Sequence, residues 1–216
     1  MAGEERGATL VDMVIAATLL VVVFGLTIPG FMLAEDTITT GGTRDQLERT
    51  GDRILSEILG ILRSGRLASI SPPGGPPSLT VHRVRTDIEL DDLTEETPDL
   101  FEPDPVVISF RTARILAESA LRTDLNRDGD LADEFALGGL DLSDGEHART
   151  FSGRPVALLG LPSFQGDLDG DAVDDPLFSF DGATVSVSLR LVSVEPGGRV
   201  LSASLRGSVK PRNSQE

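Results

Sequence analysis

The feature that most constrains the fold is a run of 22 uncharged residues near the N-terminus, residues 13–34. As a helix with a rise of about 1.5 Å per residue, it would extend about 33 Å and match the roughly 30 Å hydrocarbon core of a bilayer. A core helix would show a polar stripe, and a secretory signal would have a basic leader and a shorter apolar run. The sequence therefore predicts a single-pass membrane helix.

An acidic residue, Asp12, stands directly before this uncharged run. A carboxylate next to hydrocarbon is costly and usually marks a partner or a function. The nearest upstream base is Arg6. Asp12 therefore either reaches the membrane interface or meets a positive group from a cut N-terminus or another subunit.

Residues 6–13 read Arg-Gly-Ala-Thr-Leu-Val-Asp-Met and lead into the apolar helix. This arrangement resembles the cleavage and assembly signal of type IV pilins and pseudopilins. The resemblance implies that prepilin peptidase cuts after Gly7 and that Ala8 becomes the methylated N-terminus. It further implies that Asp12, fifth in the mature chain, pairs with the N-terminal amine of a neighbouring subunit. Pro29 stands where many family members have a helix-loosening proline, so a helix break is expected there.

Helical periodicity resumes beyond the apolar run, after a flexible joint expected at the Gly-Gly pair 41–42. The apolar positions that recur mostly on one helical face are Leu47, Ile54, Leu55, Ile58, Leu59, Ile61 and Leu62. Charged residues cover much of the remaining helix surface. This pattern predicts an amphipathic stem helix over residues 35–68, packed on a following sheet, and the Pro-rich stretch 71–77 ends all helix.

Short strands are expected in the rest of the chain. Residues 79–84 alternate apolar and polar side chains, and residues 106–110 are typical of a buried strand. Residues 185–191 and 201–209 alternate on either side of a Glu-Pro-Gly-Gly turn, which predicts a long antiparallel hairpin with one solvated face.

The expected fold class is α+β, a long N-terminal helix packed on an antiparallel β-sheet head. The membrane-spanning half of that helix is followed by its amphipathic stem. The domain organisation expected is a leader over 1–7, a transmembrane and assembly helix over 8–34, a stem over 35–68 and a β-rich head with acidic loops over 69–216. The resemblance implies the same pilin-like architecture.

The formal net charge of -16 argues against nucleic acid as a partner, because phosphate backbones are approached with Lys and Arg. The absence of Cys excludes disulfides and thiolate zinc sites. Residues 87–104 hold nine acids and no base, and their irregular spacing favours a solvated loop.

Two other acidic loops have the spacing of cation ligands. In residues 124–130, oxygen donors alternate and Gly129 occupies the sixth place of a calcium loop, but the twelfth place is Phe135 instead of a bidentate acid. The candidate calcium ligands here are Asp124, Asn126, Asp128 and Asp130, with Asp133 or Glu134 closing the shell. A second, shorter loop offers Asp167, Asp169, Asp171, Asp174 and Asp175. Ordinary Asp-Gly turns are the alternative interpretation of both loops.

No catalytic motif stands out, because the chain has two His, no Cys, no Gly-x-Ser-x-Gly and no phosphate loop. His82 is interpreted as an exposed strand residue and His147 as a loop residue. The chain is therefore expected to be no enzyme and to have no small-molecule substrate, although a membrane-anchored hydrolase that uses a metal of the acidic loops is a third hypothesis.

The function that the resemblance implies is a filament subunit, most like a W-type minor pilin of a type IV pilus or a J-type minor pseudopilin of type II secretion. Its implied partners are prepilin peptidase, the membrane, and other pilins or pseudopilins through the N-terminal helix. Its implied location is the bacterial inner membrane, with the head in the periplasm or outside, and then the filament. The alternative is a membrane-tethered calcium-binding surface or adhesion module.

Overall fold

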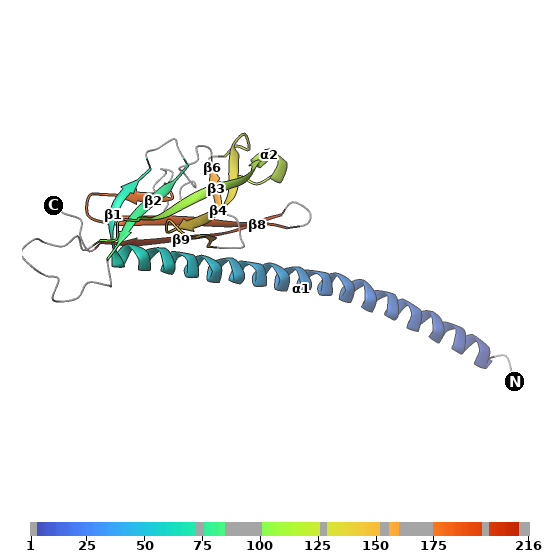
Figure 1. The fold of residues 1–216 in the computed structure, drawn as a ribbon. Helices are drawn as coiled ribbons and strands as arrows, with labels where there is room; N and C mark the ends of the chain where they lie inside the picture. The colour runs from blue at the N-terminus through green and yellow to red at the C-terminus, as the bar shows by residue number, and fades with distance from the viewer. Residues whose placement is uncertain are drawn as a thin grey trace, which may run out of the picture. The chain divides into compact units, whose positions relative to one another are not determined.

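The fold is α+β, one long N-terminal helix followed by antiparallel β-sheet structure, as the sequence predicts (Figure 1). The computed structural model describes residues 4–71, 76–84, 101–125, 129–151, 156–159, 175–195 and 199–211, with no side-chain description for residues 4–10 and 156–159. The chain divides into two compact units, Met1–Thr43 and Arg44–Glu216.

Helix α1 runs without interruption over Glu4–Ser64. Pro29 lies inside this helix, so the helix break that was expected at Pro29 does not interrupt it. The prolyl ring removes one N–H donor, but a single missing bond does not end a helix whose neighbouring turns are intact. The Gly-Gly pair 41–42 is helical and lies directly before the boundary between the two units, after Thr43. The stem helix ends at Ser64, short of the expected residue 68, because Gly65–Ile70 form strand β1.

The described strands pair antiparallel throughout, in the order β1-β2-β3-β4-β6-β8-β7, while β5 pairs with β4 and β9 pairs with β8. Besides β1, the elements are β2 (Ser78–Arg83), β3 (Val106–Ala117), the short helix α2 (Glu118–Leu121), β4 (Glu134–Ser143), β5 (Ala148–Thr150), β6 (Val156–Leu159), β7 (Phe178–Phe180), β8 (Val185–Val194) and β9 (Val200–Val209). The predicted strands at 106–110, 185–191 and 201–209 are confirmed as parts of β3, β8 and β9. The one predicted at 79–84 is confirmed as β2 up to Arg83, and Val84 forms an isolated bridge with Phe101.

The main core lies between the Arg44–Ser64 part of α1 and one face of the sheet. The predicted stem stripe supplies Leu47, Ile54, Leu55, Ile58 and Leu62, all buried in this core. Close approach is possible because Gly207 of β9 has no side chain: a Cβ there would lie 2.8 Å from a Leu59 methyl. The expectation that the stem packs its apolar stripe on the sheet is therefore confirmed.

A second hydrophobic cluster covers part of the opposite face of the sheet. It is built from Leu125, Phe135, Leu137 and Val192. Strand β8 is consequently buried on both faces over most of its length, including Ser188 and Arg190. The prediction that the β8–β9 hairpin has one solvated face is therefore wrong for β8, although in β9 the residues Ser202, Ser204, Arg206 and Ser208 are exposed.

Candidate functional site

The apolar half of α1 is fully exposed. Every side chain over residues 11–39 is exposed, and this stretch contains the segment of mean hydropathy 2.5 that is long and apolar enough to cross a membrane. Its large exposed side chains are Val11, Met13, Val14, Ile15, Leu19, Leu20, Val21, Val22, Val23, Phe24, Leu26, Ile28, Phe31, Met32, Leu33 and Ile38. An apolar surface of this size marks an interaction with a membrane or with protein.

The threonine hydroxyls of this segment are satisfied within the helix. The Thr18 hydroxyl donates to the Val14 carbonyl at 2.8 Å, and the Thr27 hydroxyl donates to the Val23 carbonyl at 2.9 Å. Such bonds to the preceding turn remove hydroxyl donors that hydrocarbon could not solvate. The two threonines are therefore compatible with an apolar surrounding.

The residues of the expected cleavage and assembly signal lie on the first turns of α1. Gly7 and Ala8 have helical backbone, and Asp12 is exposed. Arg6 lies among the residues without a side-chain description, and Asp12 makes no ion pair with any residue whose side chain the structure describes. Asp12 is thus an exposed carboxylate at one end of an exposed apolar surface.

The first acidic loop follows α2 and leads into β4. A carboxylate oxygen of Asp124 accepts the Gly129 N–H at 2.9 Å, and one of Asp130 accepts the Ala132 N–H at 2.8 Å. Gly129 has a φ of 97°, the left-handed conformation expected at the sixth place of a calcium loop. Asp133 is half-buried and Glu134 begins β4. Asn126 and Asp128 lie outside the described residues.

Two buried charged residues hold the first acidic loop by the main chain of Leu125. Glu118, fully buried in α2, accepts the Leu125 N–H at 2.6 Å, and Arg190, 6% exposed in β8, donates to the Leu125 carbonyl. The Arg190 guanidinium also donates to the Ser204 hydroxyl at 3.4 Å. Sequence reasoning missed both residues, because their burial depends on the loop folding over the outer face of β8.

The second acidic loop is represented by Asp175 alone, because Asp167, Asp169, Asp171 and Asp174 lie outside the described residues. Asp175 is 8% exposed, and its carboxylate lies 3.6 Å from the Arg206 guanidinium of β9. An arginine thus supplies positive charge beside this carboxylate. Within the part of the chain that the structure describes, no three His, Asp or Glu residues form a metal-binding group.

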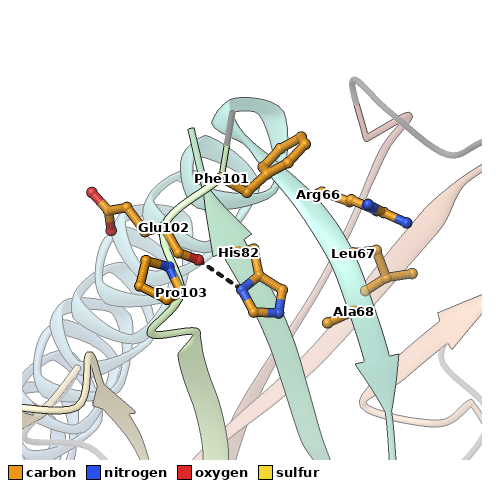
Figure 2. A pocket seen from close by; sticks show the side chains of 7 residues that line it. All are labelled: Arg66, Leu67, Ala68, His82, Phe101, Glu102 and Pro103. Carbon is orange, nitrogen blue, oxygen red and sulfur yellow. Dashed lines mark hydrogen bonds between the residues drawn. The ribbon is translucent and has the colours of Figure 1, made fainter. Parts of the chain in front are cut away.

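A surface cavity of about 420 Å³ lies beside the β1–β2 pair (Figure 2). It is lined by Arg66, Leu67 and Ala68 of β1, His82 of β2, and the segment Phe101, Glu102 and Pro103. Arg66 and His82 are directly opposite in the β1–β2 register. His82 Nδ1 lies 3.0 Å from the Glu102 carbonyl oxygen, and the Arg66 guanidinium carbon lies 5.8 Å from the centre of the Phe101 ring.

His82 is half-buried, so its interpretation as an exposed strand residue is wrong in degree. His147 is an exposed loop residue, as predicted, and its ring lies 3.8 Å from the Asp144 carboxylate. The sequence carries no signal for the cavity, because Arg66 stands where the stem helix is expected to continue.

Comparisons with protein-family models, with characterised proteins and with solved structures find no match to this chain. Two features present chemistry that points to a partner or a ligand: the exposed apolar half of α1 with Asp12, and the cavity beside Arg66 and His82.

Proposed function

We propose that this protein is a minor pilin or pseudopilin, a filament subunit of a type IV pilus or a type II secretion system that is processed by prepilin peptidase. The observation that carries the proposal is the division of one continuous helix, α1, into two chemically different halves. Residues 11–39 are exposed throughout and apolar over most of their length, whereas the stripe from Leu47 to Leu62 is buried against the sheet.

An exposed apolar helix needs a cover other than water. Burial of apolar surface is worth roughly 25 cal/mol per Å², so a helix of this composition transfers into lipid or into contact with similar helices. In a filament subunit, lipid covers the helix before assembly and neighbouring helices cover it afterwards. The satisfied hydroxyls of Thr18 and Thr27 suit both surroundings.

Asp12 supports assembly through a charge pair. A cut after Gly7 creates a positive amine at Ala8, near the start of the apolar surface that carries the exposed Asp12 carboxylate. In apolar surroundings an unpaired carboxylate is costly, so a neighbouring amine favours the register that brings the two charges together. The proposed location follows from this processing: the inner membrane with the head in the periplasm or outside, and then the filament.

Intact-mass spectrometry of membrane-extracted protein, expressed with and without prepilin peptidase, tests the processing. The expected product with the peptidase is a chain that begins at Ala8 and carries an N-terminal methyl group where the methylating activity is present. Gly7→Leu is expected to block the cut, whereas the matched leader variant Gly3→Leu is expected to be processed. An intact leader in the presence of active peptidase would contradict the proposal and leave a permanently tethered surface module.

The variant Asp12→Ala separates processing from assembly. It is expected to be cut normally but to enter filaments at a strongly reduced level, measured by the ratio of filament-bound to membrane-bound protein. Glu35→Ala removes a carboxylate at the other end of the apolar run and serves as the control. Normal incorporation of Asp12→Ala would refute the pairing role of Asp12.

A further inference from the structure

We propose that the cavity beside β1 and β2 binds a carboxylate that is attached to an apolar body. The proposal is independent of the pilin assignment, because it concerns a side-chain cluster of the head. Its basis is a cavity in which Arg66 lies opposite His82, in a protein whose net charge is -16. Arg66 and His82 are directly opposite in the strand pair, and neither has a carboxylate partner among the residues that the structure describes.

The Arg66 guanidinium is suited to hold a carboxylate. It lies 5.8 Å from the centre of the Phe101 ring, within the range of a cation–π contact. Such a contact orients the guanidinium plane and leaves its N–H groups for a ligand. The planar fork of N–H donors matches the two oxygens of a carboxylate, which makes this one of the strongest hydrogen-bonded pairs in proteins.

His82 presents its second ring nitrogen to the same space. The Glu102 carbonyl oxygen can only accept, so the hydrogen bond at 3.0 Å requires that Nδ1 carries the hydrogen. Nε2, on the other side of the ring, faces β1 (Figure 2). When the imidazole is protonated, Nε2–H becomes a second charged donor beside Arg66.

The apolar walls of the cavity and its single permanent positive charge indicate which kind of anion it can bind. Arg66 is the one side chain with a permanent positive charge among the lining residues, which suits a monoanion better than a phosphate dianion. The Phe101 ring, Leu67 and Pro103 provide apolar surface, and a volume of about 420 Å³ is in the range of small-ligand sites. The Glu102 carboxylate is turned away from Arg66 and His82, so it does not occupy the place of the ligand (Figure 2).

Two sources share this chemistry, a small apolar carboxylic acid and an acidic side chain of a polypeptide. The probes are therefore phenylacetate with its neutral isostere phenylacetamide, and the peptide acetyl-Ala-Phe-Glu-Ala-amide with its Gln counterpart. Binding is measured by saturation-transfer NMR and titration calorimetry with the full chain in detergent, and protein-free micelles give the background. The acid of each pair is expected to bind at least about 10-fold more tightly than its amide.

Variants connect the binding to Arg66 and His82. Arg66→Gln is expected to weaken binding of the acid about 10-fold or more, whereas Arg49→Gln, which removes an exposed arginine of α1, is expected to change it by less than about 2-fold. His82→Asn keeps a donor for the Glu102 carbonyl and removes Nε2. Unchanged melting temperatures show that the variants are folded.

The outcome with each probe pair identifies the source of the carboxylate. Binding of phenylacetate alone assigns a small acid to the cavity, and binding of the Glu peptide with the same Arg66 dependence assigns a polypeptide. Equal binding of acid and amide in both pairs overturns the proposal, and so does a loss in Arg49→Gln as large as that in Arg66→Gln.

Discussion

At the residue scale, the peptide groups of Leu125 show how buried charge organises the head. The N–H of Leu125 reaches the Glu118 carboxylate, and its carbonyl reaches the Arg190 guanidinium, while its own side chain is buried in the second cluster. Charged groups that are hydrogen-bonded in this way hold a loop in one position, because removing one of them leaves a buried polar group without its partner. The first acidic loop is thus anchored at its second residue.

Removal of the Glu118 carboxylate should therefore destabilise the head. Glu118→Ala is expected to lower the free energy of unfolding by about 2–4 kcal/mol, because the Leu125 N–H loses its acceptor in a buried place. Calorimetry of the full chain in detergent measures the effect. Glu146→Ala, which removes an exposed loop carboxylate, is expected to change stability by less than about 0.5 kcal/mol. Equal behaviour of the two variants would show that the anchor contributes nothing.

Acid should weaken the head through carboxylates whose pKa is lowered in the folded state. The pKa of Asp181 lies below its ordinary value because the N–H groups of Ala183 and Thr184 donate to the carboxylate. The pKa of Asp141 is lowered chiefly by the hydrogen bond from Arg111. A lowered folded-state pKa adds stability above the unfolded value of 3.8, and this contribution is lost as the pH falls through the folded-state pKa.

The melting temperature of the wild-type head should consequently fall between pH 5 and pH 3, the range that spans the ordinary pKa of Asp. Asp181→Asn keeps an oxygen acceptor but does not titrate, so its melting temperature is expected to fall less steeply. Asp45→Asn on α1 is the control and is expected to follow the wild-type slope. Parallel slopes for all three proteins would argue against the Asp181 contribution.

At the scale of elements, the two ends of strand β4 pack their side chains into different hydrophobic clusters. Phe135 and Leu137 enter the second cluster, whereas Leu140 and Leu142 enter the main core. Gly138 lies between these pairs, beside the register shift in β3 between Thr112 and Arg114. The irregularity brings the β3 backbone close to Gly138, so that the strand pair bends where its buried face changes.

The neighbouring glycines of β4 provide a matched test of this close approach. A Cβ on Gly138 would collide with the Arg111 carbonyl oxygen and lie 2.5 Å from the Phe110 ring, whereas a Cβ on Gly139 meets only the Thr150 methyl at 3.3 Å. Gly138→Ala is expected to destabilise the head by about 2–4 kcal/mol, because backbone must move. Gly139→Ala is expected to cost less than about 1 kcal/mol. Similar unfolding midpoints in denaturant for the two variants would refute the close approach.

Elements with long regular patterns could be predicted from the sequence, and elements defined by distant contacts could not. The apolar run, the stem stripe and the β8–β9 hairpin repeat one period over many residues, so helix and hairpin were expected correctly. Strand β1 has no such pattern, and only pairing with β2 makes Gly65–Ile70 extended. The burial of Arg190 depends on a loop 65 residues away in sequence, and the cavity depends on the register that brings Arg66 opposite His82.

At the scale of the whole molecule, the net charge of -16 opposes compaction by self-repulsion. Arginines relieve part of it locally, as Arg206 does for Asp175 and Arg111 for Asp141. The first acidic loop is held by the hydrogen bonds of the Leu125 main chain to Glu118 and Arg190. The carboxylates of Asp124 and Asp130 accept hydrogen bonds from loop N–H groups. Calcium binding at this loop stays a prediction from the ligand spacing.

Calcium should stabilise the full chain more than an equal ionic strength of sodium. With a dissociation constant of about 0.5 mM, typical of weak extracellular sites, 5 mM calcium is expected to raise the melting temperature of the head by about 3–6 °C over EDTA. Asp124→Asn and Asp130→Asn remove ligand charge but keep an oxygen acceptor for the loop N–H groups, so they separate the metal from the turn. Each is expected to abolish most of the calcium effect, whereas Asp181→Asn, outside the loop, is expected to retain it. General screening predicts instead that sodium, magnesium and calcium at matched ionic strength act alike in all variants, and that result would dispose of the calcium site.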